Sequence, residues 1–279
     1  MIAREVMSSP VWTVSPDETI AHARNQMVKH HISRLLVMEE EKPAGILTKK
    51  DIAFRLREPE PAWRRRPIDR IPVGAFFTRN LQEVAPETPV REIARLFISR
   101  DISSAPATED GAVLGIVTKT DLMKSPLFGR STLPVRSVME DAVVLDRYHS
   151  LDHVIEIMTE KNDKLVVVNN DGTLAGVITE TNLAFLDPSS RRPGTEEKDV
   201  VFLRKEEHAG NKLYRYVLRT TIIAEDVMSH PAVTIGPDAP VSDAVAAMRG
   251  HRVNSLVVVG KDEILGIIKR DDIIREVTK

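Results

Sequence analysis

The sequence predicts a mixed α/β fold built from four copies of one unit, each ordered strand, helix, strand, strand, helix. The first observation behind this prediction is a motif of glycine, two apolar residues, threonine, two variable residues and aspartate. It occurs intact at residues 45–51 and 115–121 and altered at 176–182 and 266–272 of the 279-residue chain. Because the spacing is kept while the polar residues change, one structural unit has been copied with its binding positions free to diverge.

The second observation is that the repeat extends upstream of the glycine. Offsets of 70, 131 and 221 residues from the first copy bring apolar residues together at three further positions. The sets are Val14, Val84, Leu145 and Ile235; Ile20, Val90, Leu151 and Val241; and Met27, Phe97, Met158 and Met248. Three matching apolar positions in four copies indicate a shared core, so each copy is expected to fold in the same way.

The elements of copy 1 follow from local pattern. Residues 11–14 predict a short strand, and residues 15–18 supply capping residues for a helix whose apolar face runs from Ile20 to Val28. Two apolar runs, 35–38 and 44–47, are separated by a polar turn and predict a hairpin. Thr48 stands where the second helix is expected to begin.

The same pattern divides the chain into domains. We expect repeats at 1–57, 73–125, 134–187 and 222–279, with an inserted segment at 188–221. Within the insertion, residues 200–204 and 213–219 predict two strands of an additional hairpin. The lengths of the connections do not by themselves show which repeats pair.

Composition excludes several classes of protein. The chain is 42% hydrophobic and 29% charged, which is typical of a folded globular protein, and its formal net charge is −2. Without cysteine it forms neither disulfides nor zinc-cysteine sites and lacks thiol catalysis. No secretory signal or membrane span is expected, so we expect a cytoplasmic protein that does not enter a membrane.

The threonine and aspartate of the motif permit two interpretations. A threonine before the first turn and an acidic residue three positions later form a capping box, which satisfies backbone donors at a helix N-terminus. The same hydroxyl and carboxylate also suit a phosphate and a ribose diol. Both interpretations are compatible within one site.

The chain resembles the cystathionine-β-synthase (CBS) domain family in this motif and in the segments 30–37 and 251–259. Four such domains without an attached enzyme resemble the architecture of the gamma subunit of AMP-activated protein kinase. The resemblance implies two Bateman modules of paired repeats, in which adenosine nucleotides bind in the clefts. We expect an intramolecular disc, with Ile52 and Leu122 as candidates for the contact between modules.

Carried over by position, the resemblance assigns ligand contacts in the first module. Thr48 and Thr118 would contact phosphate or ribose, and Asp51 and Asp121 would hold the ribose hydroxyls. Further expected contacts are adenine at Ile32 and Ile102, and phosphate at His30, His31, Arg34 and Arg100.

The second module departs from this pattern. Copy 3 retains Thr179 but has Asn182 for aspartate and Asp163 in place of the apolar adenine contact, so we expect it to be the empty copy. Copy 4 has Lys269 for threonine and keeps Asp272, with Val253, Arg252 and His251 nearby. Lys269 would either reach a phosphate or fill the cleft.

The expected function is non-enzymatic regulation by an adenosine ligand: AMP, ADP or ATP, with S-adenosylmethionine and NAD as alternatives. No catalytic or metal site is expected. The partners would be an unidentified regulated protein and a second copy of the chain. Two other functions stay open, a nucleic-acid-associated regulator that uses Trp63, Arg64, Arg65 and Arg66, and a structural oligomer whose sites have decayed.

Overall fold

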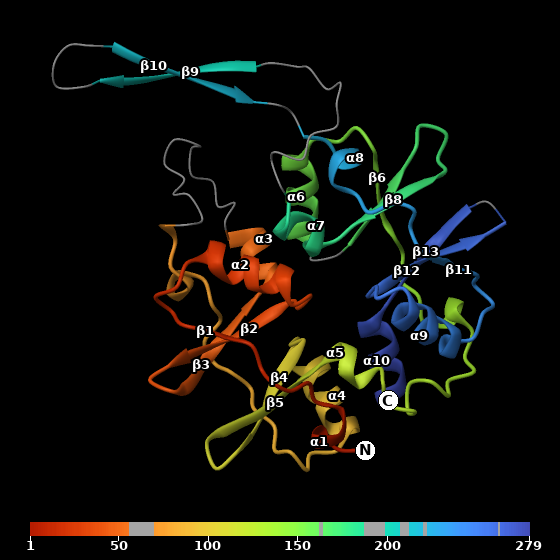
Figure 1. Cartoon of the computed structure of the whole chain (residues 1–279). Coiled ribbons are helices and arrows are strands. Elements are labelled where there is room, and N and C mark those ends of the chain that lie inside the picture. Colours follow the sequence, from red (N-terminus) through yellow and green to blue (C-terminus); the bar gives the residue numbers. More distant parts are fainter. Residues whose placement is uncertain (56–69, 162–163, 187–198, 207–211, 220–221, 262) are drawn as a thin grey trace.

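The computed structural model describes most of the chain. The described residues are 1–55, 70–161, 164–186, 199–206, 212–219, 222–261 and 263–279. Figure 1 shows four small α/β units around a common centre, with one hairpin extending away from them.

Copy 1 contains the predicted elements in the predicted order. They are β1 (Thr13–Val14), α2 (Ile20–Lys29), β2 (Arg34–Glu39), β3 (Lys42–Thr48) and α3 (Lys49–Arg55). Strand β2 lies between β1, with which it pairs in parallel, and β3, with which it pairs antiparallel.

The other copies repeat this order. In copy 2 an isolated bridge between Val84 and Ala107 takes the place of the first strand. The remaining elements are α4 (Val90–Ser99), β4 (Ser104–Glu109), β5 (Ala112–Thr118) and α5 (Lys119–Leu122) in copy 2; β6 (Val143–Asp146), α6 (Leu151–Lys161), β7 (Leu165–Val168), β8 (Leu174–Ile178) and α7 (Glu180–Ala184) in copy 3; and β11 (Thr234–Ile235), α9 (Val241–Gly250), β12 (Ser255–Gly260), β13 (Glu263–Lys269) and α10 (Arg270–Thr278) in copy 4.

The first helix of a copy forms because its apolar residues recur with helical spacing. In α4, Val90, Ile93, Ala94 and Phe97 are all buried, whereas the opposite face is charged. The chain then turns into the next strand through a residue in the left-handed region. That residue is Asp101 in copy 2 (φ 49°), His31 in copy 1 (φ 53°) and Arg252 in copy 4 (φ 55°).

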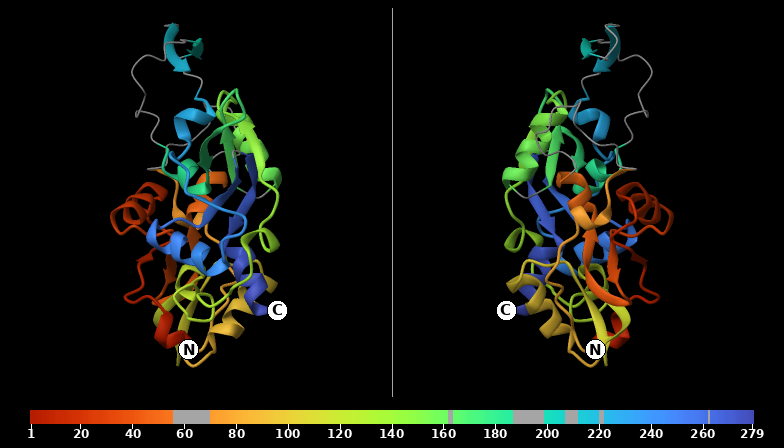
Figure 2. Two further views of the ribbon diagram at one scale, coloured as in Figure 1. Left: turned by 90° about the vertical axis from the view of Figure 1, so that its right-hand side faces the viewer. Right: turned by 90° about the vertical axis from the view of Figure 1, so that its left-hand side faces the viewer.

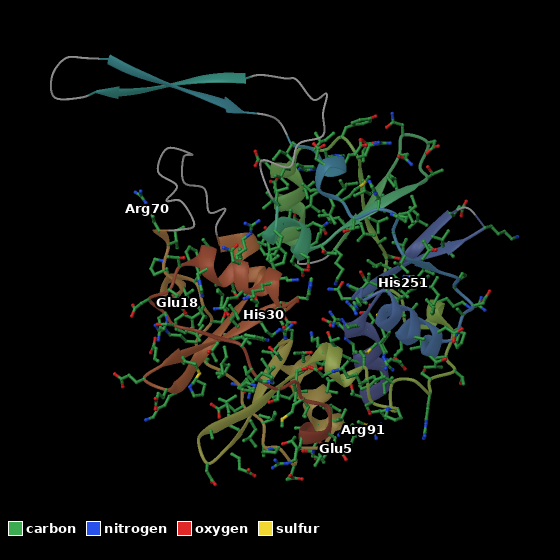
Figure 3. The ribbon with its side chains drawn as sticks, viewed as in Figure 1. Glu5, Glu18, His30, Arg70, Arg91 and His251 are labelled. Atoms are coloured by element: carbon green, nitrogen blue, oxygen red, sulfur yellow. The ribbon has the colours of Figure 1, made fainter. Side chains whose placement is uncertain are left out.

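The segment that opens each copy packs on the neighbouring copy of its module. These segments contain α1 (Ala3–Val6), the 3₁₀ turns η2 (Val73–Ala75) and η3 (Val135–Ser137), and α8 (Ala224–Val227). Ser8 of copy 1 bridges Ile116 of copy 2, and Thr78 of copy 2 bridges Ile46 of copy 1. Figure 3 accordingly shows Glu5 of α1 in the same part of the molecule as Arg91 of α4.

The second module exchanges its opening segments in the same way. Glu140 bridges Ile267 of copy 4, and Ser229 bridges Val177 of copy 3. This reciprocal exchange pairs copy 1 with copy 2 and copy 3 with copy 4, which the lengths of the connections left open.

The exchange explains why the motif begins with glycine. The opening segment of the partner copy lies directly against each of these glycines, so that an added Cβ would overlap it. The closest approach of such a Cβ would be 2.3 Å to Thr78 O at Gly45, 2.6 Å to Met7 Sδ at Gly115, 2.8 Å to Met228 Sδ at Gly176 and 2.5 Å to Glu140 O at Gly266. Glycine is therefore required by close packing between the paired copies.

The two modules face each other and close a disc within one chain (Figure 1), which is seen edge-on in Figure 2. Helix α3 of copy 1 packs on α7 of copy 3, and α10 of copy 4 packs on α4 and α5 of copy 2. Across these contacts Arg24 donates to the Ala184 carbonyl at the end of α7, and Arg95 donates to the Thr278 carbonyl at the end of α10.

The core is shared between the modules. One large cluster joins copies 2 and 4 and includes Phe97, Leu122 and Ile273; the other joins copies 1 and 3 and includes Ile52 and Leu183. The predicted contact residues Ile52 and Leu122 are thus both buried in these clusters. Apolar packing therefore holds the two modules together at both of their contacts.

The predicted hairpin of the insertion is confirmed. Strands β9 (Asp199–Glu206) and β10 (Lys212–Arg219) pair antiparallel and form a separate two-stranded sheet. In Figure 1 this hairpin projects beyond copy 3. None of the helices in the described part of the chain combines the length and apolarity that a bilayer crossing requires.

Candidate functional site

A cavity of about 380 Å³ lies where the four copies meet. Its lining comes from equivalent positions of the repeat. One is the first residue of each second helix: Lys49, Lys119, Glu180 and Arg270. Since all four second helices begin at this cavity, whatever binds there contacts both modules.

The positive charge of the lining is concentrated in copy 1. Copy 1 contributes the cations Arg34, Lys49 and Lys50 and no acid, whereas copy 3 contributes Lys164 and the acids Glu140 and Glu180. Copies 2 and 4 together contribute four cations (Lys119, Lys269, Arg270, Arg275) and three acids (Asp101, Asp271, Asp272).

Between copies 2 and 4, the second helices exchange polar contacts around a pseudo-twofold axis. Lys119 Nζ donates to Asp271 Oδ2 over 2.8 Å, and Arg270 donates to the hydroxyl of Thr120. In each contact the first residue of one helix meets the second residue of the other. These contacts hold α5 and α10 together at the wall of the cavity.

The cations of copy 1 lie close enough to other cations for their charges to repel. Arg34 donates to the Ser103 carbonyl over 2.6 Å. Burial and the nearby Arg270 lower the pKa of Arg34 to about 10. Burial and Arg34 also lower the pKa of Lys49, whose ammonium lies 4.7 Å from the centre of the Phe185 ring. An anion bound here would relieve this repulsion.

In copy 1 the motif forms the capping arrangement expected from its spacing. Both the backbone N–H and the hydroxyl of Thr48 donate to Asp51 Oδ2, over 2.9 and 2.7 Å. Both residues are half-buried, and Thr48 lines the cavity. The capping interpretation is therefore confirmed, and it leaves the threonine at the edge of the candidate site.

In copy 2 the aspartate has further partners within the protein. Thr118 caps through Asp121 Oδ2, while Ser8 and Lys124 donate to Asp121 Oδ1 over 3.1 and 2.6 Å. Only 3% of Asp121 is exposed. A ribose diol would have to displace Ser8 or Lys124 from Asp121. Since Asp51 is half-buried, copy 1 offers the more exposed aspartate.

In copy 3 both the oxygen and the nitrogen of the Asn182 side-chain amide make hydrogen bonds within the protein. Its Oδ1 accepts from the N–H and the hydroxyl of Thr179, both over 2.9 Å. Its Nδ2 donates to the Val227 carbonyl and to Ser229 Oγ, over 2.8 and 3.0 Å. Asparagine thus ties the motif to the exchanged segment, as Asp121 does through Ser8 in copy 2.

In copy 4 the lysine of the motif makes an ion pair within the protein. Lys269 Nζ lies 2.5 Å from Glu140 Oε2, and Arg275 Nη1 lies 3.1 Å from Glu140 Oε1. Burial and the neighbouring Glu140 raise the pKa of Asp272 to about 7. Burial alone would raise the pKa of Glu140. Hydrogen bonds from Lys269 and Asp272 nevertheless lower this pKa to about 2.

The remaining predicted contacts lie away from the lining of the central cavity. Ile32, Ile102 and Val253 are half-buried beside the cores, and His31, Arg100 and Arg252 are exposed. His30 stacks on Trp12, with ring centroids 3.4 Å apart. Figure 3 shows His30 and His251 on opposite sides of the centre. Asp163 and the 63–66 segment lie outside the described residues.

Glu140, Ser8 and Lys49 did not enter the sequence-based site. A signal for the first two was present, since each directly follows a methionine that opens its copy, and these methionines occupy equivalent positions against the motif glycines. Lys49 lies inside the motif at a variable position, so the motif assigns it no role. The structure places it at the cavity.

Comparisons with known proteins agree with this architecture. Protein MJ1225 of Methanocaldococcus jannaschii, described as an archaeal homologue of g-AMPK, has a solved structure that matches with a TM-score of 0.80 at 19% identity, over 99% of both chains. A conserved protein of Pyrococcus horikoshii matches with a TM-score of 0.62 at 16% identity, over 99% of this chain and all of the other. These likenesses show a shared fold.

Curated relatives match by sequence. Protein MJ1404 of Methanocaldococcus jannaschii is 22% identical over 98% of this chain and 61% of its own length. Inosine-5'-monophosphate dehydrogenase of Thermoplasma acidophilum is 32% identical over 39% of this chain and 22% of its own length. The chain therefore spans less than two thirds of either relative.

A family model described as CBS domain matches residues 3–58, 73–127, 135–187 and 224–279, which together make up most of the chain. The four matches coincide with the four structural copies. The chain therefore belongs to the CBS-domain family, and its four repeats form two Bateman modules.

Proposed function

We propose that this protein regulates a partner by binding an adenosine nucleotide whose phosphates enter the central cavity. The observation that carries the proposal is the group of three cations, Arg34, Lys49 and Lys50, that copy 1 contributes to the lining without an acid. Phosphate oxygens accept charge-assisted hydrogen bonds, and binding would offset the mutual repulsion of these cations. The cavity volume of about 380 Å³ lies in the range of small-molecule sites.

The adenosine part of the proposal rests on the family. In this proposal Thr48 and Asp51 hold the ribose of a ligand in copy 1, Ile32 contacts adenine, and Arg34 contacts the phosphates. The half-buried Asp51 supports copy 1 over copy 2 as the principal site, because Asp121 is only 3% exposed. AMP, ADP and ATP fit this charge better than S-adenosylmethionine, which carries a positive sulfonium.

The regulatory mechanism follows from the position of the cavity. A ligand whose phosphates touch copies 1 and 3 contacts both modules at once. It therefore stabilises one relative orientation of the modules by its differential affinity, and a protein partner can respond to that orientation. No chemical change in the ligand is required.

The proposal is tested by thermal unfolding of the full chain with AMP, ADP, ATP, NAD, S-adenosylmethionine and inorganic triphosphate. We expect the nucleotides to raise Tm in a concentration-dependent manner. In Arg34→Ala/Lys49→Ala the stabilisation by ATP should be lost, whereas Lys29→Ala, at an exposed position on α2, should behave as the parent. Stabilisation by inorganic triphosphate equal to that by ATP would indicate a simple anion site instead.

A further inference from the structure

Four equivalent positions on the exchanged segments face the four motifs. Each of these residues forms an isolated β-bridge to the strand that precedes a second helix. They are Thr78 facing copy 1, Ser8 facing copy 2, Ser229 facing copy 3 and Glu140 facing copy 4. Three of them carry a short hydroxyl side chain. Only the position facing copy 4 carries a long, charged side chain.

The motif position opposite these residues changes in the same copy. It is Thr48, Thr118 and Thr179 in the first three copies and Lys269 in the fourth. Where the other copies have two short hydroxyl residues at these facing positions, glutamate and lysine face each other at copy 4. The two residues are 129 positions apart in the chain. The two changes complement each other in charge, because each charge would otherwise lie partly buried without its partner.

The two long side chains at copy 4 meet each other within the protein. Lys269 Nζ lies 2.5 Å from Glu140 Oε2, and the lysine side chain is only 14% exposed. Arg275 binds the other carboxylate oxygen of Glu140 over 3.1 Å. Both oxygens of Glu140 therefore have cationic partners supplied by copy 4 itself.

The aspartate of the motif in copy 4 is as buried as Asp121 of copy 2, but its surroundings contain the Glu140–Lys269 pair. Asp272 is 3% exposed, and its Oδ2 accepts from the backbone N–H of Lys269 over 2.8 Å. Its Oδ1 is buried and accepts no hydrogen bond from any residue that the structure describes. A ribose diol cannot reach this carboxylate unless the Glu140–Lys269 pair is displaced.

We infer that copy 4 is closed by its own Glu140–Lys269 ion pair, so the protein binds adenosine ligands at fewer positions than it has repeats. The inference rests on the proposed function. It distinguishes between the two roles expected for Lys269, which are binding a ligand phosphate and filling the cleft. Its ammonium is held by Glu140, which favours the alternative that lysine fills the cleft over the alternative that it binds a ligand phosphate. The closed cleft also fastens the opening segment of copy 3 to copy 4.

Counting bound nucleotide on the full chain tests the inference. Equilibrium dialysis with radiolabelled AMP and ATP would compare the parent with Glu140→Ser/Lys269→Thr, which restores the hydroxyl pair of copy 2. We expect the double variant to bind one further ligand per chain, and Glu140→Thr/Lys269→Thr, which installs the threonine pair of copy 1, to do the same. The reciprocal variant Thr48→Lys/Thr78→Glu installs the ion pair in copy 1 and should bind one ligand fewer.

A measurement on the parent covers the case in which a variant does not fold. Acetylation of lysines, followed by peptide mass spectrometry, should modify Lys269 much more slowly than the exposed Lys29 and Lys261. Equal rates would overturn the inference, because the ammonium would then be accessible.

The outcomes separate the two proposals. If the folded double variant binds the same number of nucleotides as a parent that does bind them, the closed cleft is refuted and the proposed function stands. If neither the parent nor any variant binds an adenosine nucleotide, the proposed function fails, and the inference fails with it because no cleft was opened.

Discussion

Lys119 of copy 2 and Asp271 of copy 4 form an ion pair across the two modules, with 2.8 Å between Nζ and Oδ2. The lysine side chain is 10% exposed and the aspartate side chain 41% exposed, so the lysine end of the pair is buried at the wall of the cavity. Burial alone would raise the pKa of Asp271, but the nearby Lys119 lowers it. This contact joins the modules at the point where a ligand would act on both.

Breaking this pair should destabilise the disc. We expect Lys119→Met to lower the free energy of unfolding by about 1–3 kcal/mol, because it leaves Asp271 without its partner. Urea denaturation would measure the change. Lys279→Met removes the exposed pair with Glu276 and should cost less than about 1 kcal/mol. Equal effects of the two variants would contradict a structural role for the cross-module pair.

The motif glycine gives a second prediction. Gly115→Ala would place a Cβ 2.6 Å from Met7 Sδ and 3.1 Å from the Ser8 carbonyl, so the exchanged segment must shift. We expect a loss of about 1–3 kcal/mol in unfolding free energy, as in other overpacked sites. Gly129→Ala is the matched control, since its Cβ would meet nothing within 4 Å. A neutral Gly115→Ala would mean that the opening segment does not pack there.

The shared cores predict how the two halves behave when separated. Residues 1–133 and 134–279 would each expose half of the clusters that contain Ile52, Leu122, Leu183 and Ile273. Exposed apolar faces of this size associate. Light scattering should therefore find the separate halves as dimers and the full chain as a monomer or a dimer of discs. Monomeric halves would contradict the role of these faces.

Much of this architecture was predictable because it depends on local pattern. Apolar spacing around Ile20 and Met27 predicts a helix, and repetition of that spacing predicts four equal units. The exchange of opening segments was not predictable, since Ser8 and Ile116 are far apart in the chain and neither has an unusual local pattern. The glycine that the exchange requires was seen, but its physical reason depends on a backbone from another copy.

The candidate site was predictable to the extent that each copy acts alone. Thr48 and Asp51 were found from their spacing within one motif. Arg34 was predicted as a phosphate contact, but Lys49 was not, because its position within the cation cluster depends on Arg34 and on the helices of the other module. Lys269 was noticed as an exception, but its partner Glu140 belongs to the opening segment of copy 3.

The two aspartates of the first module give a prediction about ligand binding. If Asp51 accepts from a ribose diol, Asp51→Ala should weaken binding of AMP or ATP by about 1.5–3 kcal/mol. We expect a smaller effect of Asp121→Ala, because Ser8 and Lys124 already occupy that carboxylate. Calorimetry on both variants, with circular dichroism to verify folding, would measure the difference. A larger loss in Asp121→Ala would place the principal site in copy 2.

The carboxyl pair in copy 4 predicts a dependence of stability on pH. The charged groups facing Asp272 are Glu140, Lys269 and Arg275, and burial with Glu140 raises its pKa from 3.8 to about 7. The folded state therefore binds more protons than the unfolded state between these values, so the contribution of Asp272 to stability is complete below pH 3.8 and is lost as pH rises through 7.

Replacing Asp272 by asparagine should remove this loss. The amide of Asp272→Asn imitates the protonated acid and can donate to Glu140, so we expect the variant to be more stable than the parent by about 1–3 kcal/mol at pH 8 and nearly equal to it at pH 5. Asp271→Asn is the matched control of opposite sign, because its lowered pKa means that the ionised form stabilises the fold. Urea denaturation at both pH values distinguishes them. If Asp272→Asn were less stable than the parent at pH 8, the charge of Asp272 would be favourable in the fold, and its proton would not be shared with Glu140.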